Sequence, residues 1–280
     1  MPSVDNYLLG TDTTELQRLG IQHRLWAAQA ASIWERAGIG VGARVLDIGT
    51  GPGYAAADLA ELVGPSGRVL GIEGSPNYID AFVDRMAALE LDQPQGRTEI
   101  RRGDIHQLDA ILTADELGSY DAAYCRWVLS FSPDIDTVLT HIHAALKPGG
   151  RVIIQDYFNW RAMSIAPRDP VFTKTINALL EYWEGNEGSN DIMGDAPRAL
   201  REAGFQLTHF DATQRVAFPG SPLWAWPDSF WPSIIPRVVE AGNLSQSDAD
   251  AFFRLWRDAS QDPDRFIAVP PVYDAIAIKS

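Results

Sequence analysis

The chain has 280 residues and a mass of 30.8 kDa, which is enough for one large α/β domain or for a core domain with a cap. Its hydrophobic fraction of 46% and charged fraction of 21% exclude disorder as the main state. The 37 acidic residues outnumber the 23 basic ones, so the net charge is −14 and the surrounding field repels nucleic acid and anionic membranes. The composition therefore favours a neutral or cationic small molecule as partner.

Cysteine usage and the first residues of the chain bear on its compartment. Cys125 is the single cysteine, so no internal disulfide can form, which favours a reducing compartment. No basic segment followed by an apolar run begins the chain, and no stretch approaches the roughly 18 apolar residues of a membrane span. The Cys and His residues also lack metal-ligand spacing. We expect a cytoplasmic protein with neither a membrane segment nor a metal.

The first predicted element is an amphipathic helix over residues 13–37, whose apolar stripe is interrupted by His23. From its end to about residue 156, short apolar runs alternate with helical patterns. The expected strands are 43–48, 68–73, 98–102, 120–126 and 150–156, and the expected helices lie near 54–63, 75–90 and 134–146. Apolar strands separated by helices pair in parallel through right-handed crossovers, so this pattern predicts a doubly wound α/β sheet.

After residue 156 the alternation becomes irregular. Helices are predicted at 169–184 and 196–203, and two further strands at 205–210 and 273–278. A long insertion at 219–265 separates those strands, begins with five prolines in eighteen residues, and holds a helix expected from Ser245 to about Trp256. Because no linker separates an independent domain, we interpret these segments as elaborations of one sheet.

A glycine-rich loop follows the first strand, with Gly49, Gly51 and Gly53 at alternate positions after Asp47. Such glycines permit tight turns and let a ligand approach the free amides at the start of the next helix. A dinucleotide fingerprint requires G-x-G-x-x-G, and here the third glycine comes one residue early. The Asp47 carboxylate would also repel a pyrophosphate. The loop favours a cationic ligand, with a nicotinamide-dependent oxidoreductase as the weaker alternative.

Three features follow at the ends of later strands, the edge at which open α/β sheets bind ligands. Glu73 ends the second strand, where a carboxylate can accept two ribose hydroxyls. Asp104 and Ile105 follow the third, where an acid can accept from an exocyclic amine and an apolar side chain can face a purine. The segment Tyr124–Trp127 ends the fourth strand. These positions predict a nucleoside site.

Together these motifs resemble the class I S-adenosylmethionine-dependent methyltransferases, in their ubiquinone/menaquinone-biosynthesis-like small-molecule branch. The residues that carry the resemblance are the Asp47–Gly53 loop, Glu73, Gly103-Asp104-Ile105, Arg126-Trp127-Val128-Leu129 and Leu146-Lys147-Pro148-Gly149-Gly150, within about residues 40–157. The opening Tyr7–Gly10, followed by Glu15–Gln22, is similar to the amino-terminal cap of one subset of that branch.

The resemblance implies a mostly parallel seven-stranded sheet with an antiparallel last strand. It divides the chain into an amino-terminal helical cap (1–38), a cofactor-binding core (39–157) and the rest of the sheet with tryptophan-rich insertions (158–280). It also implies S-adenosylmethionine as cofactor, with S-adenosylhomocysteine as product. The residues it implies as cofactor ligands are Tyr7, Asp47, Gly49, Thr50, Gly51, Gly53, Glu73, Gly74, Ser75, Asp104, Ile105, Cys125 and Arg126.

Within that set, the resemblance places Asp47 beneath the cofactor's amino group and Glu73 on the ribose hydroxyls. Asp104 and Ile105 would contact the adenine. Two members have a plain structural interpretation of similar weight: Arg126 could simply pair with an acid, and Tyr7 could be a surface anchor.

No residue of the sequence is compelled to act as a base. His23, Asp156 and Tyr157 are the candidates, His23 because it breaks an apolar stripe and the others because they follow the fifth strand. Aromatic side chains of the later segments are the acceptor-pocket candidates, with a packed core as the alternative for each. They are Trp160, Trp183, Phe218, Trp224, Trp226, Phe230 and Trp231.

These observations predict an enzyme that transfers a methyl group from S-adenosylmethionine to a small, apolar or aromatic molecule. The non-enzymatic alternative is an S-adenosylmethionine-binding sensor or pseudo-enzyme without turnover. The expected partner is the small-molecule acceptor, without nucleic acid or membrane.

Overall fold

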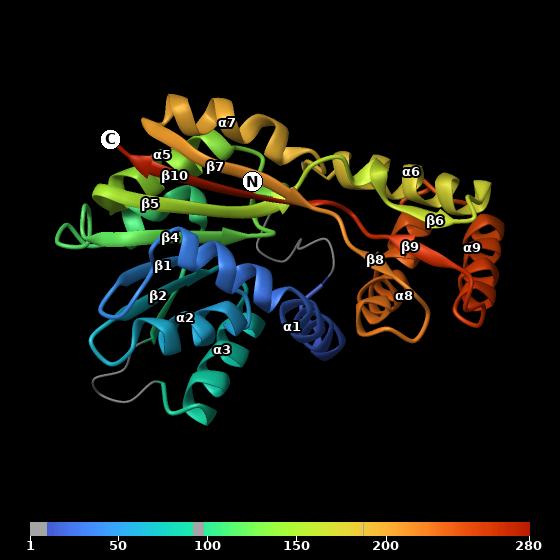
Figure 1. Cartoon of the computed structure of the whole chain (residues 1–280), viewed down its shortest axis with the longest axis horizontal. Coiled ribbons are helices and arrows are strands. Elements are labelled where there is room, and N and C mark those ends of the chain that lie inside the picture. Colours follow the sequence, from blue (N-terminus) through green and yellow to red (C-terminus); the bar gives the residue numbers. More distant parts are fainter. Residues whose placement is uncertain (1–9, 92–97, 187) are drawn as a thin grey trace.

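The computed structural model describes residues 10–91, 98–186 and 188–280, which form a seven-stranded sheet covered by helices and a smaller cap beside it (Figure 1). The strands lie in the order β3-β2-β1-β4-β5-β10-β7. They are β1 (Arg44–Ile48), β2 (Arg68–Glu73), β3 (Thr98–Arg102), β4 (Tyr120–Arg126), β5 (Leu146–Tyr157), β7 (Phe205–Thr213) and β10 (Val272–Lys279). The first five pair in parallel, whereas β10 is antiparallel to both β5 and β7. The predicted doubly wound sheet with an antiparallel last strand is confirmed.

Helices cover both faces of this sheet because successive strand residues point to opposite sides. On one face lie α1 (Thr13–Arg36), α2 (Tyr54–Val63) and α3 (Pro76–Ala88), and on the other α4 (Leu108–Ile111), α5 (Ile135–Ala145) and α7 (Ile192–Glu202). In β1, Val45 packs with the first group of helices, while Leu46 and Ile48 pack with the second. Two separate apolar layers therefore hold the sheet.

The cap contains three helices and a second, three-stranded sheet. The helices are α6 (Pro170–Glu184), α8 (Ala225–Glu240) and α9 (Gln246–Ala259), and the strands, in spatial order, are β6 (Ser164–Ala166), β9 (Phe266–Ala268) and β8 (Val216–Ala217). Short 3₁₀ turns occupy Ile105–Gln107, Leu129–Phe131, Trp160–Ala162 and Pro222–Trp224. At the centre of the cap, Trp231 is fully buried among the rings of Phe172, Phe252 and Trp256. The cap thus has an apolar core of its own.

The proline-rich start of the 219–265 insertion contains a helix, α8, that the residue pattern did not predict. Pro227 lies in its first turn, where the missing N–H is not needed for a helical bond. Pro232 and Pro236 lie inside the helix and each removes one backbone hydrogen bond. Burial of the α8 face that carries Trp226 and Ile234 compensates for this loss. The expected helix from Ser245 is confirmed as α9, and the small sheet was missed because strands of two or three residues show no periodicity.

Helix α1 connects the large sheet to the cap (Figure 1). Its carboxyl-terminal half packs against the sheet, where the Gln29 side chain donates a 2.7 Å hydrogen bond to buried Asp274. Asp274 also accepts from Gln155, which in turn accepts from the Tyr124 hydroxyl. The amino-terminal half of α1 extends beyond the sheet edge and contacts α8. A cavity lies between the strand ends, α1 and the cap.

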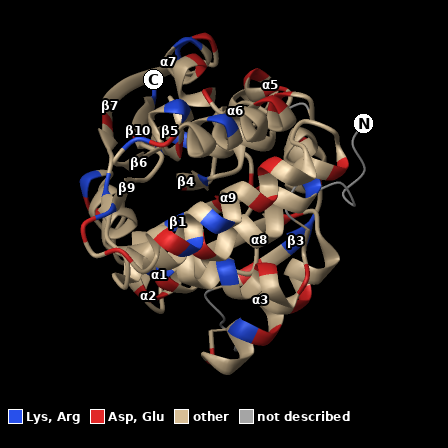
Figure 2. Cartoon of the chain, turned by 90° about the vertical axis from the view of Figure 1, so that its right-hand side faces the viewer, with Lys and Arg blue, Asp and Glu red and all other residues tan. Residues whose placement is uncertain are grey.

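The charges on the cap surface are mixed. Figure 2 shows Lys and Arg interspersed with Asp and Glu on the side that α8 and α9 present, so the net charge of −14 is not concentrated there. No helix in the described ranges is long and apolar enough to cross a membrane.

Replacing Trp231 with Ala is expected to lower the free energy of unfolding by about 3–5 kcal/mol, because the cavity left in the cap core cannot close. Phe218→Ala is the matched control, since Phe218 is 49% exposed and its loss should cost about 1 kcal/mol or less. Urea unfolding of both variants checks this. An equal loss in both would show that Trp231 does not organise the cap.

Candidate functional site

A cavity of about 700 Å³ opens where the carboxyl ends of β1, β2 and β4 meet α1 and the cap. Its lining has a polar half at the strand ends and an aromatic half against the cap. The polar half includes Asp47, Gly49, Thr50, Gly51, Glu73, Gly74, Ser75, Asp104, Ile105 and Arg126. The aromatic half includes Trp127, Phe131, Tyr157, Trp160, Trp183, Trp226 and Phe230. The polar and aromatic halves are therefore two chemically different parts of one continuous cavity.

The glycine loop is shaped by close approach of its neighbours. Gly49 and Gly53 both have positive φ, at +61° and +79°. A Cβ at Gly49 would lie 2.5 Å from Val128, and one at Gly53 would lie 2.5 Å from the Phe82 ring, so neither position accepts a side chain. At Gly51 a Cβ would meet nothing within 4 Å, so the backbone there faces open space.

Two carboxylates flank this loop. Asp47 is 3% exposed and accepts a 2.6 Å hydrogen bond from the Thr50 hydroxyl. Glu73 accepts hydrogen bonds from the backbone amides of Gly51, Gly74 and Ser75, each at 2.9 Å. These bonds fix the Glu73 carboxylate at the end of β2, facing the cavity.

Burial changes the acidity of both groups. It raises the pKa of Asp47 to about 7, with the nearby Glu73 carboxylate adding to the effect and the Thr50 hydrogen bond and Arg126 opposing it. Burial also raises the pKa of Glu73, against the lowering effect of its three amide donors. A cation placed between these carboxylates would relieve the cost of their ionisation.

Arg126 ends β4 and brings a positive charge to the same edge. One of its amino groups, Nη2, lies 2.7 Å from His23 Nδ1, and His23 Nε2 lies 3.0 Å from Asp58 Oδ2. Its other amino group, Nη1, is buried and has no hydrogen-bond partner among the described residues. A buried guanidinium donor without a partner is unfavourable unless a ligand supplies an acceptor.

At the far end of the polar half, Asp104 is more exposed. It caps the turn that follows β3 and accepts from both the His106 amide and His106 Nδ1, at 2.9 and 2.7 Å. His106 Nε2 lies 2.8 Å from the Ser132 hydroxyl. One Asp104 oxygen is thereby used within the turn, and Ile105 lies beside it in the cavity lining.

The aromatic half is built around Trp127, which has a positive φ of +53° at the end of β4. Its ring lies 6.2 Å from Tyr157 and 6.1 Å from Trp226. Trp160 lies 5.7 Å from Tyr157 and 6.0 Å from Trp183, so the rings form a continuous wall. An unusual backbone conformation at a non-glycine residue is typical of functional sites, and here it points the Trp127 side chain into the junction of the two halves.

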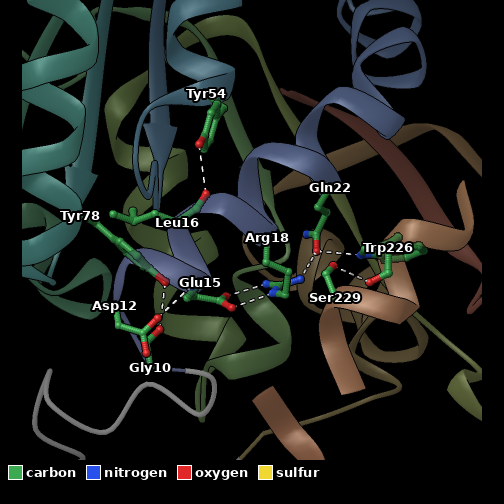
Figure 3. Close-up of polar contacts among 10 residues, drawn as sticks. All are labelled: Gly10, Asp12, Glu15, Leu16, Arg18, Gln22, Tyr54, Tyr78, Trp226 and Ser229. Atoms are coloured by element: carbon green, nitrogen blue, oxygen red, sulfur yellow. Dashed lines mark hydrogen bonds and ion pairs between the residues drawn. The ribbon is translucent and has the colours of Figure 1, made fainter. Parts of the chain in front are cut away.

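A buried polar network joins α1 to α8 beside the cavity (Figure 3). Arg18 donates two 2.6 Å hydrogen bonds to Glu15 and one of 2.7 Å to Gln22. The side-chain oxygen of Gln22, Oε1, also accepts from the Trp226 indole N–H at 2.9 Å, which fixes α8 to α1. The network therefore positions a cap residue of the aromatic half relative to the polar half.

Most of the residues expected around a cofactor line one cavity. Ten of them are in the polar half, whereas Gly53 and Cys125 do not line the cavity: Gly53 packs on Phe82, and Cys125 is buried inside the sheet. Tyr7 lies outside the described residues.

Some of the predicted catalytic and acceptor residues also line the cavity, and others do not. His23, Tyr157, Trp160, Trp183, Trp226 and Phe230 line the cavity. Asp156 does not, because it is fully buried and accepts from the amides of Val128, Ser130 and Tyr157. Three aromatic candidates also lie elsewhere: Trp231 in the cap core, Trp224 stacked on Trp256 at 4.5 Å, and Phe218 exposed against Phe266.

Arg18, Gln22 and Trp127 also line the cavity and were not among the predicted site residues. Arg18 and Gln22 are four residues apart on α1, on the face that also carries Trp26, so polar residues within a buried stripe were the available signal. For Trp127, the sequence of the strand-end segment indicates its neighbours Cys125 and Arg126, and nothing in that sequence shows the positive φ.

The fold and this site are those of a doubly wound α/β enzyme, and comparison with known proteins identifies its family. Residues 39–204, more than half of the chain, match the model of the methyltransferase domain family. The chain belongs to that family.

Curated relatives carry several specific activities. A demethylmenaquinone methyltransferase of Lactococcus lactis is 35% identical over 47% of this chain and 48% of its own length. A 2-phytyl-1,4-naphtoquinone methyltransferase of Synechococcus elongatus is 33% identical, over 58% of this chain and 61% of its own. An arsenite methyltransferase of Aquipseudomonas alcaligenes is 34% identical, over 52% and 42%. The chain thus spans about half the length of the curated relatives it matches.

Solved structures share the fold at lower identity. Haemonchus contortus phosphoethanolamine N-methyltransferase 2, in complex with phosphomonomethylethanolamine and S-adenosylhomocysteine, has a TM-score of 0.56 and 20% identity, covering 100% of this chain and 60% of that one. The [4+2]-cyclase SpnF has a TM-score of 0.56 and 16% identity, and the match covers 90% of this chain and 80% of that one. Because the second is named as a cyclase, the fold alone does not define the reaction.

Asp47→Asn is expected to stabilise the ligand-free protein at pH 8 by about 2–4 kcal/mol. The pKa of Asp47 is raised from 3.8 to about 7, so the folded protein holds this proton more tightly than the unfolded chain does. The stability that comes from this proton is fully present below about pH 4 and is lost as the pH rises through about 7. Asparagine removes the buried charge and can still accept from Thr50. Urea unfolding at pH 5 and pH 8 measures the effect, which should be less than half as large at pH 5.

The matched control for that substitution is Asp109→Asn, because the Asp109 side chain is 62% exposed and should show no such gain. If Asp47→Asn instead lowers the free energy of unfolding at pH 8, the buried Asp47 charge does not destabilise the ligand-free protein, and this interpretation is contradicted.

Proposed function

We propose that the protein transfers a methyl group from S-adenosylmethionine to a small, planar, apolar or aromatic acceptor. The observation that carries the proposal is the single cavity that joins three strand-end acids and an arginine to a wall of aromatic rings. Membership of the methyltransferase domain family and the activities of the curated relatives support it.

The polar half fits the cofactor group by group. Glu73 would accept the ribose hydroxyls, and Asp104 with Ile105 would meet the adenine. Asp47 would hold the amino group, where a positive charge relieves the ionisation cost that its raised pKa of about 7 reports. The open backbone at Gly51 leaves room for a ligand to approach the loop. When bound, S-adenosylmethionine supplies an electrophilic methyl group.

The aromatic half would hold the acceptor. Trp127, Tyr157 and Trp160 present ring faces and edges that favour stacking with a planar molecule. Their enclosure also excludes water and fixes the approach of the two reactants, which are the main contributions a protein can make to an in-line displacement.

The described lining of the aromatic half contains no carboxylate or histidine. The acids of the cavity lining, Asp47, Glu73 and Asp104, all lie in the polar half. Its two histidines already have partners, because His23 bonds Asp58 and Arg126, and His106 bonds Asp104 and Ser132. Apart from the Tyr157 hydroxyl, the described lining of the aromatic half therefore offers orientation rather than proton removal to the acceptor. This suits a nucleophile that is already neutral and basic or already ionised, such as an electron-rich ring in its anionic form.

The test is calorimetric titration with S-adenosylhomocysteine, followed by turnover measurements with S-adenosylmethionine and a panel of planar aromatic and aliphatic acceptors. Binding together with turnover on a planar acceptor is expected. Binding without turnover on any acceptor would indicate a sensor, and binding of a nicotinamide dinucleotide in its place would indicate an oxidoreductase.

Trp160→Ala is expected to lower kcat/KM for the acceptor by about tenfold or more while leaving the affinity for S-adenosylhomocysteine unchanged, because it removes acceptor contact without touching the polar half. Trp224→Ala is the matched control, since Trp224 is also a buried cap tryptophan but does not line the cavity. Parallel steady-state kinetics and calorimetry check both. An equal effect of the two substitutions on kcat/KM would contradict the assignment of the aromatic half to the acceptor.

A further inference from the structure

We propose that Asp58, His23 and Arg126 form a relay that orients the Arg126 guanidinium toward the carboxylate of the cofactor's amino-acid portion, with His23 as a positioning residue. This inference rests on the proposed function. It assigns roles to His23 and Asp58, which belong to helices rather than to the strand-end motifs.

The charges along the sheet edge have an order that matches a zwitterion. From β3 through β2 and β1 to β4 the cavity presents Asp104, Glu73, Asp47 and Arg126, three negative groups followed by one positive group. β1 and β4 are paired neighbours, and the charge of Arg126 lowers the pKa of Asp47. An amino acid placed with its ammonium at Asp47 would direct its carboxylate toward Arg126.

The tautomer of His23 follows from its partners. A carboxylate oxygen accepts, so the 3.0 Å contact with Asp58 Oδ2 places the ring proton on Nε2. Nδ1 then carries a lone pair and accepts from Arg126 Nη2 at 2.7 Å. Burial lowers the pKa of His23, and the charges of Arg126 and Arg85 lower it further against the opposing effect of Asp58, so the ring stays neutral.

The ring of His23 is also held in place sterically. It stacks on Tyr54 of α2 with centroids 5.6 Å apart, and Arg85 of α3 lies 3.6 Å from the centroid of the same Tyr54 ring. The Tyr54 hydroxyl donates to the Leu16 carbonyl of α1 at 3.0 Å (Figure 3). His23 therefore contacts Asp58 and Tyr54 of α2 and Arg126 of β4, and the charge of Arg85 of α3 acts on it from beyond Tyr54.

The two amino groups of the Arg126 guanidinium therefore differ, because one has a hydrogen-bond partner and the other has none within the described part of the chain. Arg126 Nη2 is committed to His23, whereas Nη1 is buried without a partner among the described residues. The ring faces of Trp127 and Tyr124, at 4.9 and 5.9 Å, restrict it further. A carboxylate would satisfy the remaining donor by a charge-assisted hydrogen bond.

The test compares two ligands by calorimetry: S-adenosylhomocysteine and 5′-methylthioadenosine, which has the same nucleoside and sulfur but a methyl group in place of the amino-acid portion. His23→Phe keeps a ring to stack on Tyr54 but removes both nitrogens. It is expected to weaken S-adenosylhomocysteine binding by about 10- to 100-fold, the value of one charge-assisted hydrogen bond. Binding of 5′-methylthioadenosine should change by no more than about twofold.

Two further variants separate positioning from a general structural role. His23→Asn keeps an acceptor near the place of Nδ1 and should recover part of the lost affinity for S-adenosylhomocysteine. Adding His23→Phe to Arg126→Ala should cause no further loss, because the relay acts through the guanidinium. The control is His141→Phe, which breaks a similar His–Asp contact to Asp109, at 3.6 Å, away from the cavity.

Unchanged S-adenosylhomocysteine affinity in His23→Phe, or an equal loss for both ligands, would overturn the relay. Identical losses in His23→Asn and His23→Phe would overturn it as well. The proposed function fails separately, if the unmodified protein binds neither ligand.

Discussion

The site is organised around one buried carboxylate, that of Asp47. Asp47 lies one residue before the end of β1, a strand that β2 and β4 flank, and its burial raises its pKa to about 7. A nearby carboxylate, Glu73, makes ionisation more costly still, and only Thr50 and Arg126 offset it. A protein that places acids in this way gains nothing in stability from them, so their cost is consistent with a site made for a positively charged ligand.

Around this carboxylate the chain arranges two compartments that meet at one residue. The strand ends supply charge and backbone amides, and the cap supplies rings. Trp127, with its positive φ, follows Arg126 directly and so carries the chain from the charged half into the aromatic half. Helix α1 holds the halves together, because its Gln22 accepts from Trp226 of the cap and its His23 accepts from Arg126 of the sheet.

The strand-end half was predictable from the residues because its signals are local. The Asp47–Gly53 loop, Glu73 and Asp104 each lie at or just after the carboxyl end of a strand, and a parallel sheet brings such positions to one edge. The cap could not be predicted in this way. Pro232 and Pro236 hide the helical pattern of α8, and whether a tryptophan faces a cavity or a core depends on packing between distant segments. Trp226 and Trp231 are five residues apart on α8, and one lines the cavity while the other is fully buried. Nor could the pairing of His23 with Arg126, 103 residues apart, be read from local pattern.

The most direct test of the central claim is the number of protons released when S-adenosylhomocysteine binds, measured by calorimetry at pH 6.5 in buffers of different ionisation enthalpy. If Asp47 is held partly protonated until a cation arrives, binding should release a proton in about half or more of the binding events, and the release should disappear in Asp47→Asn. Proton uptake, or release that persists in Asp47→Asn, would contradict the account.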